Sequence, residues 1–449
     1  MTSYAHIKHP FCYTGESDGY GYAFVPGNNN GIVLLDLRSK ELLENPSIFK
    51  NGADEQRLEL LAKKGLLIKQ GEKINSGCSL VNSPIRTFGT WLHVTNACNL
   101  SCPYCYIKKD YTSMSIETAK AYLNKLELLV VKYNIKSLDI RFAGGEPTLQ
   151  KDLIQTITQE MDLRFTSKDV KYTLTLITNG VLLNRSWLAF IKANGIRICI
   201  SLDGINEWHD KLRFLDNGKG TFEIIWPNIK LCQEEGLNTS ILTTVTEQNL
   251  EGLEELNKLL VDTNLTFRYG VYRDTNGKYQ DYQDFIKKLS IVLRNCYDYY
   301  ANNIRKGEAT FKHQLADIRI DNHRHLRCCS SGHSGISVKH DGTIYLCQSR
   351  MNANYIGTVF DHQDFFEMIK NQSSVPSLRN KDVRDYQHCG HCKWALTCGG
   401  GCPVVNLDTY GTIATASPYC DLFTEFIPRL IDLKALSLIK ALQRRKEVK

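Results

Sequence analysis

Long hydrophobic runs are missing from the sequence: its apolar stretches are as short as β-strands, and none approaches the roughly 20 residues of a membrane-spanning helix. The first residues also lack a basic segment followed by an apolar one, which marks a secretory signal. Neither sign of charge dominates: the chain has 55 Lys and Arg and 48 Asp and Glu, and the resulting net charge of +7 is spread along the sequence. We therefore expect a cytoplasmic protein with neither a membrane nor a nucleic acid as partner.

The overall composition excludes the unusual classes of chain. Hydrophobic residues make up 42% and charged residues 23%, which is ordinary for a globular protein and unlike collagen, a disordered tail or a coiled coil. At about 150 residues per domain, 449 residues predict two to four domains.

Cysteine, by contrast, is abundant. The chain has 16 cysteines, and eleven of them fall in the segments 98–105, 328–347 and 389–420. In a reducing compartment disulfides are rare, so clustered cysteines indicate bound metal.

From residue 88 onward, strand-like apolar runs alternate with amphipathic stretches. Six runs have the strand character: 88–95, 137–143, 172–178, 196–202, 238–245 and 265–272. The stretch 115–133 opens with Ser115, a residue type that caps helix starts. This alternation predicts βα units around a parallel sheet, either open or closed into an incomplete barrel. We expect a final helix over residues 421–446.

Residues 19–72 have a different pattern. The runs GYAFVPG and GIVLLDL flank an Asn-Asn-Asn-Gly turn, which favours a β-hairpin. Two helical patterns (39–49 and 54–64), a capping Gly65 and a last strand, LLIKQ, follow. We interpret this segment as a small winged-helix-like α+β module.

The most specific motif is Cys98-Asn-Leu-Ser-Cys102-Pro-Tyr-Cys105, directly after the first strand of the series. Three thiolates on one tight loop can bind three corners of a cubane iron–sulfur cluster and leave one iron open. A structural zinc site uses four ligands, and no fourth Cys or His lies close by, since His93 belongs to the strand.

This loop resembles that of the radical S-adenosylmethionine (SAM) superfamily, including the aromatic Tyr104 before the last cysteine. The resemblance implies a [4Fe–4S] cluster at Cys98, Cys102 and Cys105 whose open iron binds SAM. One electron from the cluster then cleaves SAM to methionine and a 5′-deoxyadenosyl radical. Because the cofactors supply this chemistry, the role of the protein is to position them and to exclude water.

Further motifs resemble the same family at the ends of the next strands. Gly144-Gly145-Glu146-Pro147 matches the motif that holds the SAM amino group, and Asn179 and Ser201 follow the same layout, with Ser201 expected at the SAM carboxylate. Arg213, in His209-Asp210-Lys-Leu-Arg213, is either a partner of that carboxylate or paired with Asp210. Carboxyl ends of strands are where α/β barrels build active sites.

The carboxyl-terminal cysteines resemble the SPASM domain of radical SAM enzymes that modify peptides, and anaerobic sulfatase-maturating enzymes most closely. By this resemblance two auxiliary [4Fe–4S] clusters are expected. Cys329, Cys347 and Cys402 would hold the first; Cys389, Cys392, Cys398 and Cys420 would hold the second. Zinc also suits such spacing, but iron is favoured beside a radical SAM core.

Two departures from that family stand out. The further cysteine that sulfatase maturases carry before the position of Cys329 is absent, so the first cluster either has an open iron or uses Cys328, His323 or His325. Adjacent side chains diverge, which argues against Cys328. Gln348 stands where those maturases have the Asp proposed as base, and an amide cannot take up a proton as a carboxylate does. We assign no catalytic residue.

The resemblance implies an α/β fold: a winged-helix-like module in residues 1–85, a partial (β/α)6 radical SAM barrel in 86–310 and a SPASM domain in 311–449. The expected enzyme oxidises a residue of a ribosomally made precursor peptide, giving a thioether or a carbon–carbon or carbon–oxygen crosslink. The module either binds the peptide's leader by strand addition or only packs on the barrel. The electron donor would resemble flavodoxin or ferredoxin. Alternatives are oxidation of a folded protein client, such as a sulfatase or dehydrogenase subunit, and a non-catalytic metal-bearing peptide-binding protein.

Overall fold

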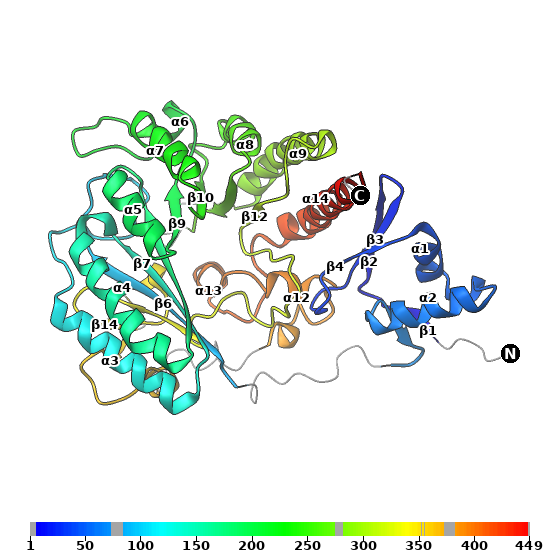
Figure 1. Ribbon diagram of the computed structural model, residues 1–449, viewed down its shortest axis with the longest axis horizontal. Helices are drawn as coiled ribbons and strands as arrows, with labels where there is room; N and C mark the ends of the chain where they lie inside the picture. The colour runs from blue at the N-terminus through cyan, green and yellow to red at the C-terminus, as the bar shows by residue number, and fades with distance from the viewer. Residues whose placement is uncertain are drawn as a thin grey trace.

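The structure is a computed structural model that describes residues 6–72, 84–273, 282–351, 353, 355–371 and 382–447. Figure 1 shows a large sheet wrapped by helices, a loop-rich part next to it, and a small separate module formed by the first residues of the chain. In the described part of the chain, no helix combines the length and the apolar character needed to cross a membrane.

The central sheet is built from parallel strands that follow one another in space as they do in the chain. They are β6 (Thr87–Thr95), β7 (Ser137–Gly144), β8 (Lys171–Thr178), β9 (Arg197–Ser201), β10 (Thr239–Val245), β11 (Thr266–Val271) and β12 (His313–Leu315). The first six are the strands expected from the sequence. β12 has only three residues and was not predicted.

On the other side of β6 the sheet continues with three more strands. β13 (Gly335–Val338) is parallel to β6, while β14 (Thr343–Tyr345) and β15 (Tyr355–Thr358) are antiparallel additions. The chain therefore returns to the first barrel strand after completing the barrel. This return brings Cys347, which lies just after β14, to the side of the cysteine loop that follows β6.

Helices cover the outer face of the parallel strands, as the alternation of the sequence predicts (Figure 1). They are α3 (Ile116–Tyr133), α4 (Lys151–Phe165), α5 (Arg185–Ala193), α6 (Glu207–Asp210), α7 (Phe222–Glu234), α8 (Leu253–Asp262) and α9 (Tyr282–Lys306). Ser115 caps α3, since its hydroxyl accepts a hydrogen bond of 3.0 Å from the backbone N–H of Thr118. The result is a partial (β/α) barrel.

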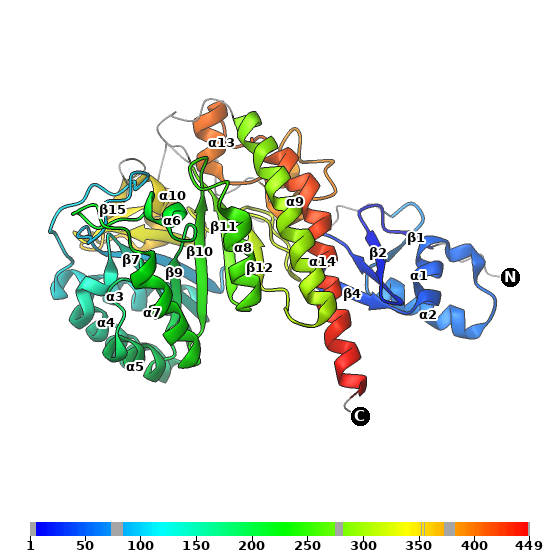
Figure 2. The same cartoon turned by 90° about the horizontal axis from the view of Figure 1, so that it is seen from above.

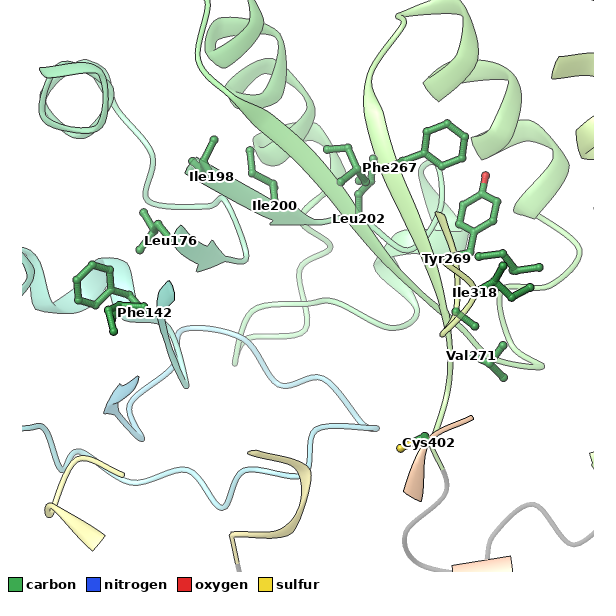
Figure 3. Close-up of a cluster of buried hydrophobic side chains, with 14 of the residues drawn as sticks. Phe142, Leu176, Ile198, Ile200, Leu202, Phe267, Tyr269, Val271, Ile318 and Cys402 are labelled. Carbon is green, nitrogen blue, oxygen red and sulfur yellow. The ribbon is translucent and has the colours of Figure 1, made fainter. Parts of the chain in front are cut away.

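The core lies between the strands and these helices. Phe142, Leu176 and Ile198 come from three neighbouring strands and are almost completely buried (Figure 3). Burial of such a side chain stabilises the fold by about 1.5–3 kcal/mol. Arg141 and Thr175, which precede Phe142 and Leu176, line the inside of the barrel instead, because successive strand residues point to opposite faces.

The carboxyl-terminal part contains short helices joined by long loops. Its helices are α10 (Phe365–Lys370), α12 (Ala395–Cys398), α13 (Pro403–Tyr410) and α14 (Cys420–Glu447). The ring of Phe365 stacks on Phe88 of β6 at 5.6 Å between centroids, which fixes α10 to the sheet. α14 is the expected final helix and runs beside α9 (Figure 2).

The first residues form what we call the N-terminal module (residues 6–72). It contains β1 (His6–Lys8), β2 (Tyr13–Ser17), β3 (Tyr20–Phe24), β4 (Ile32–Leu35), α1 (Leu37–Glu44), α2 (Gly52–Lys63) and β5 (Leu67–Lys69). The expected hairpin is β3–β4, which β2 extends to three strands, while β5 pairs with β1. The module has a small core of its own, formed by leucines of both helices and β5.

The N-terminal module contacts the last helix of the chain. The hydroxyls of Tyr13 and Tyr22 both donate to the same oxygen of Asp432, each at 2.8 Å, and Lys440 pairs with Asp18 at 3.0 Å. Tyr22 and Phe24 of the module also belong to the same buried hydrophobic cluster as the apolar residues of α14. The module therefore rests on α14 through polar and apolar contacts, on the side away from α9 (Figure 2).

Candidate active site

The cysteine loop (residues 96–112) leaves the carboxyl end of β6 and carries Cys98, Cys102 and Cys105. It is held from below by the segment after α6: the N–H of Ser101 donates to the carbonyl of Phe214 at 2.8 Å, and its hydroxyl donates to Asp216 at 2.6 Å. All three thiols line one cavity of about 430 Å³ at the carboxyl ends of the strands, which we call the main cavity.

The structure brings the other sequence-predicted cofactor residues to the same place. The lining of the main cavity includes Tyr104, Gly144, Gly145, Glu146, Asn179, Ser201 and Arg213. Tyr104 belongs to the cysteine loop itself, and the others come from the ends of β7, β8 and β9 and from the loop after α6. They meet because the strands are parallel and adjacent.

The glycines of the Gly-Gly-Glu-Pro motif approach protein backbone very closely. A Cβ at Gly145 would lie 2.2 Å from the carbonyl oxygen of Ala97, and one at Gly144, whose φ is +140°, would lie 2.3 Å from that of Thr95. This proximity lets Gly145 N–H donate to Thr95 at 2.7 Å and Glu146 N–H donate to Ala97 at 2.8 Å. The sequence suggested an approach to a ligand; the structure shows that the pair also fastens β7 to the cysteine loop.

Glu146 is buried and connects two strand ends. Its carboxylate accepts hydrogen bonds from the N–H of Asn179 at 2.7 Å, from the hydroxyl of Thr178 at 2.7 Å and from the hydroxyl of Thr148 at 2.6 Å. Burial raises the pKa of Glu146, against the opposing effect of these donors. Asn179 continues the network, since its amide donates to Asn99 of the cysteine loop at 2.7 Å.

Arg213 pairs with Asp203 rather than with Asp210, which corrects the alternative drawn from the sequence. Its Nε lies 2.6 Å from an Asp203 oxygen that the Tyr104 hydroxyl also contacts. Asp210 instead accepts the N–H groups of Thr221 and Phe222 at the start of α7. The side chain of Arg213 is 11% exposed and faces the main cavity, so a role at the SAM carboxylate stays a prediction.

His209 of the same motif has a structural position. It is fully buried, it accepts from the Asp203 N–H at 3.2 Å, and its Nε2 lies 3.0 Å from the hydroxyl of Thr221. Burial lowers its pKa to about 3, so the ring is neutral and holds the turn that carries Asp203.

The donor set fits a cubane cluster with one open iron. The main cavity is lined by three thiols from one loop and, in the described part of the chain, by no histidine or fourth cysteine. No three Cys, His, Asp or Glu side chains in that part meet closely enough to hold a single metal ion, and a cubane spaces its thiolates more widely than one ion does. Burial raises the pKa of the free Cys98 thiol to about 11, whereas a cluster binds the thiolate.

The second cysteine group consists of Cys389, Cys392, Cys398 and Cys420. All four line one small cavity of about 50 Å³, whose remaining wall is largely apolar and includes Trp394, Phe423 and Ile427. Four thiols around a single enclosed space are the arrangement that the sequence predicted for the second auxiliary cluster. Which metal group they hold stays a prediction.

The first cysteine group consists of Cys328, Cys329, Cys347 and Cys402. Cys402 lies beyond Val271 at the carboxyl end of β11 (Figure 3), and it is close enough to Cys328, Cys329 and Cys347 for their charges to interact. Adjacent residues thus do approach one centre here, although the divergence of neighbouring side chains argued against it. Cys328, His323 and His325 were the candidates for a fourth ligand of the first auxiliary cluster. His325 pairs with Asp321 at 2.7 Å and His323 is exposed, so Cys328 is the best placed of the three.

Several residues of the main cavity were missed from the sequence. Arg268 and Asp317 line it, and so does Arg273, which pairs with Asp317 at 3.3 Å. Asp317 follows Ala316, a non-glycine residue with a φ of +45°, an unfavourable conformation that often marks functional positions. Arg273 could have been found from its place after β11, but Asp317 follows β12, which was itself missed. Gln348 also lines this cavity.

Comparison with known sequences agrees with this geometry. Residues 92–260 match the model of the Radical SAM superfamily. A cysteine-type anaerobic sulfatase-maturating enzyme from Clostridium novyi (strain NT) is 25% identical over 360 residues, which cover 74% of this chain and 92% of the relative.

Two solved structures share the fold. Native anSMEcpe with bound AdoMet and Cp18Cys peptide has a TM-score of 0.63 and 20% identity over 78% of this chain and 99% of its own. Streptococcus suis SuiB bound to precursor peptide SuiA has a TM-score of 0.53 and 15% identity over 92% of this chain and 98% of its own. The second match includes part of the N-terminal module, because residues from Thr87 onward make up only about four fifths of the sequence.

Proposed function

We propose that this radical SAM enzyme, whose cofactors are a [4Fe–4S] cluster and SAM, is a maturase that oxidises a ribosomally made precursor peptide. The observation that carries the proposal is the main cavity, which joins the cysteine loop to Gln348, the neighbour of Cys347 in the first cysteine group. Bound at the cysteine loop, the cluster and SAM supply the radical chemistry that removes a hydrogen atom from the substrate. A substrate in this cavity would lie between the two centres.

The residues around the cavity have separable tasks in this proposal. Glu146 and Asn179 hold the ends of β7 and β8 against the cysteine loop, so the three thiols keep one geometry. Arg213 offers a guanidinium to the carboxylate of SAM while Asp203 fixes its orientation. Tyr272 and Tyr419 close the side toward α14, where the Tyr419 hydroxyl donates to the Tyr272 carbonyl at 3.1 Å and limits access of water.

Both carboxyl-terminal cysteine groups belong to the proposal as sites of auxiliary iron–sulfur clusters. Oxidation of the substrate releases an electron, and the first cysteine group is the nearer of the two to the main cavity, since Arg273 lines the cavity and interacts electrostatically with Cys402. In this proposal residues 1–85, 86–310 and 311–449 form a leader-recognition module, the radical SAM core and a SPASM domain.

The N-terminal module supports a peptide substrate over a folded one. β2 and β4 are the outer strands of its sheet, so among the described residues each pairs with another strand on one side only. Addition of a peptide strand at such an edge is a known way of binding an extended peptide. SuiB, whose match extends into this module, is a protein seen with a precursor peptide.

Oxidation of a folded protein client is the second candidate. The similarity to an anaerobic sulfatase-maturating enzyme favours it. Against the sulfatase form, Gln348 provides an amide where a carboxylate base is expected, and an amide cannot accept the proton released on oxidation.

Mass spectrometry of a co-expressed peptide tests the proposal. Any short peptide encoded beside this gene is produced anaerobically with the wild type, with Cys102→Ala, and with Cys232→Ala as a matched control buried in α7 outside the cysteine groups. We expect loss of two hydrogen atoms from the peptide with the wild type and Cys232→Ala only. An unchanged mass together with no deuterium uptake from heavy water contradicts the peptide proposal and leaves the folded client.

A further inference from the structure

A second cavity, which we call the inner cavity, lies inside the barrel below the main cavity. Its volume is about 550 Å³, and it is lined from β6, β7 and β8 by Trp91, Arg141 and Thr175. Four residues line both cavities: Trp91, Ile177, Leu242 and Arg268. The two cavities therefore adjoin each other inside the barrel, and these four side chains form the junction between them.

Cationic side chains outnumber carboxylates in the lining of the inner cavity. Arg141, Arg268, Arg319 and Lys434 line it together with the carboxylate of Asp321. Outside the lining, Asp139 pairs with Arg141, so Arg319 and Lys434 supply the charge that is not already paired. Asp321 is already paired with His325 at 2.7 Å. Among the described residues, no carboxylate lies within ion-pair distance of Arg319 or Lys434, and Arg319 is exposed at the opening. Such a cavity attracts carboxylates, because low-dielectric walls strengthen the field of the charges that line them.

Arg268 links this charge to the junction with the main cavity. Its Nη2 donates to the carbonyl of Ala316 at 2.9 Å and lies 3.6 Å from Asp317, while its Nε is buried with no hydrogen-bond partner in the described structure. A buried donor without a partner is costly, and a bound carboxylate would satisfy it.

The position of α14 connects the inner cavity with the N-terminal module. Leu430 and Lys434 of α14 line the cavity, whereas Asp432 between them accepts from Tyr13 and Tyr22 of the module. Residues i and i+4 share a helix face and residue i+2 lies on the opposite one. The cavity and the module thus flank the same turn of α14, which Figure 2 shows between the barrel and the module.

We propose that the inner cavity binds an acidic segment of the peptide substrate, so that aspartate or glutamate side chains flank the residue that is modified in the main cavity. The peptide enters from the amino-terminal side of the barrel, one helix away from the module. The inference rests on the proposed function for the identity of the ligand as substrate, but the binding itself is measurable without any reaction.

Fluorescence anisotropy with labelled hexaglutamate tests the site, with labelled hexaglutamine as the uncharged comparison. The enzyme is used as the full-length chain with its clusters reconstituted. We expect the wild type to bind hexaglutamate more tightly than hexaglutamine, and Arg319→Glu and Lys434→Gln each to weaken hexaglutamate binding about tenfold. Arg185→Glu is the matched control, because Arg185 is exposed at the start of α5, outside both cavities.

The results separate this inference from the proposed function. Equal weakening by Arg185→Glu, or unchanged affinity in both Arg319→Glu and Lys434→Gln, overturns the acidic subsite. Circular dichroism shows whether Arg319→Glu or Lys434→Gln has failed to fold. If one of them has, the hexaglutamate affinity of the other decides whether the acidic subsite exists. Formation of 5′-deoxyadenosine by the wild type is measured on the same preparation: its absence overturns the enzyme proposal while intact, variant-sensitive hexaglutamate binding still supports the subsite.

Discussion

The change Gly145→Ala probes how β7 holds the cysteine loop. The added Cβ would lie 2.2 Å from the carbonyl oxygen of Ala97 and 2.5 Å from that of Asn96. Both contacts are with backbone, which cannot turn aside as a flexible side chain can. The loop or the strand end therefore has to move.

The expected cost follows from two contributions. Overpacking of this kind costs about 1–3 kcal/mol. Moving the loop also strains the bonds from Gly145 N–H to Thr95 and from Glu146 N–H to Ala97, each of which contributes about 0.5–1.5 kcal/mol. Together these give about 2–6 kcal/mol, a large fraction of the 5–15 kcal/mol that is typical of a folded protein.

Urea unfolding of the cluster-free protein measures this cost, and iron content after anaerobic reconstitution measures its consequence for the loop. Gly89→Ala is the control, because a Cβ there meets only Asp139 and Ser334 oxygens at 3.7 and 4.0 Å, which is ordinary contact. We expect Gly145→Ala to unfold at lower urea and to lose the iron of one cluster, while Gly89→Ala retains both properties. If the two variants match in stability and iron content, the anchoring role assigned to Gly145 is wrong.

Four other changes have defined outcomes. Arg213→Ala leaves the Asp203 side chain, which is 0% exposed, without its guanidinium and should destabilise the protein by about 3–5 kcal/mol in urea unfolding; wild-type stability would contradict the pairing. His313 has a pKa lowered by burial to about 3 from 6.5, so the unfolded chain binds a proton that the folded chain does not. The contribution of His313 to stability is therefore complete above about pH 6.5 and falls by up to about 1.4 kcal/mol per pH unit toward acid. His313→Gln should make the slope measured by unfolding between about pH 7 and pH 5 shallower without abolishing it, because buried His209 keeps its own contribution; an unchanged slope would contradict this role. Tyr13→Phe combined with Tyr22→Phe keeps the aromatic packing but removes both donors to Asp432, each worth about 1.5–3 kcal/mol, and should lower the stability measured by urea unfolding, unlike Tyr410→Phe at an exposed position; equal stability of both variants would argue against this docking contact. Cys328→Ala should lower the iron content of the reconstituted protein and alter its electron paramagnetic resonance signal, whereas His323→Ala should change neither; the reverse result would assign the fourth ligand to the histidine.

Much of the barrel was predictable because its signals are local. The apolar runs of six strands and the capping Ser115 at the start of α3 could each be recognised within a few consecutive residues. β12 escaped because three residues are too few to show a period, and Asp317 escaped with it. A short strand of this kind is stabilised by its neighbour β11 rather than by its own pattern.

The pairing of side chains was less predictable than their presence at the site. Arg213 has Asp210 three residues before it, yet it pairs with Asp203, ten residues away, because the turn around His209 folds the chain back on itself. The inward-facing charges of Arg141 and Arg268 also gave no sequence signal, since a polar residue within a strand indicates an exposed face as readily as the inside of a barrel. The charges of Arg141 and Arg268 meet inside the barrel only because the parallel strands curve around a common interior.

The contact between the N-terminal module and α14 has a consequence for biosynthesis. Ribosomes synthesise a chain from its amino terminus, so the module leaves the ribosome before the barrel and α14 do. The module also has a leucine core of its own. Its docking partner, Asp432, is translated after Cys420, which follows the other clustered cysteines, and Lys440 follows later still. The barrel strands and all eleven clustered cysteines have therefore been translated before the module can take its place. A chain that stops between Cys420 and Asp432 carries all eleven clustered cysteines, yet its module lacks the hydrogen bonds to Asp432.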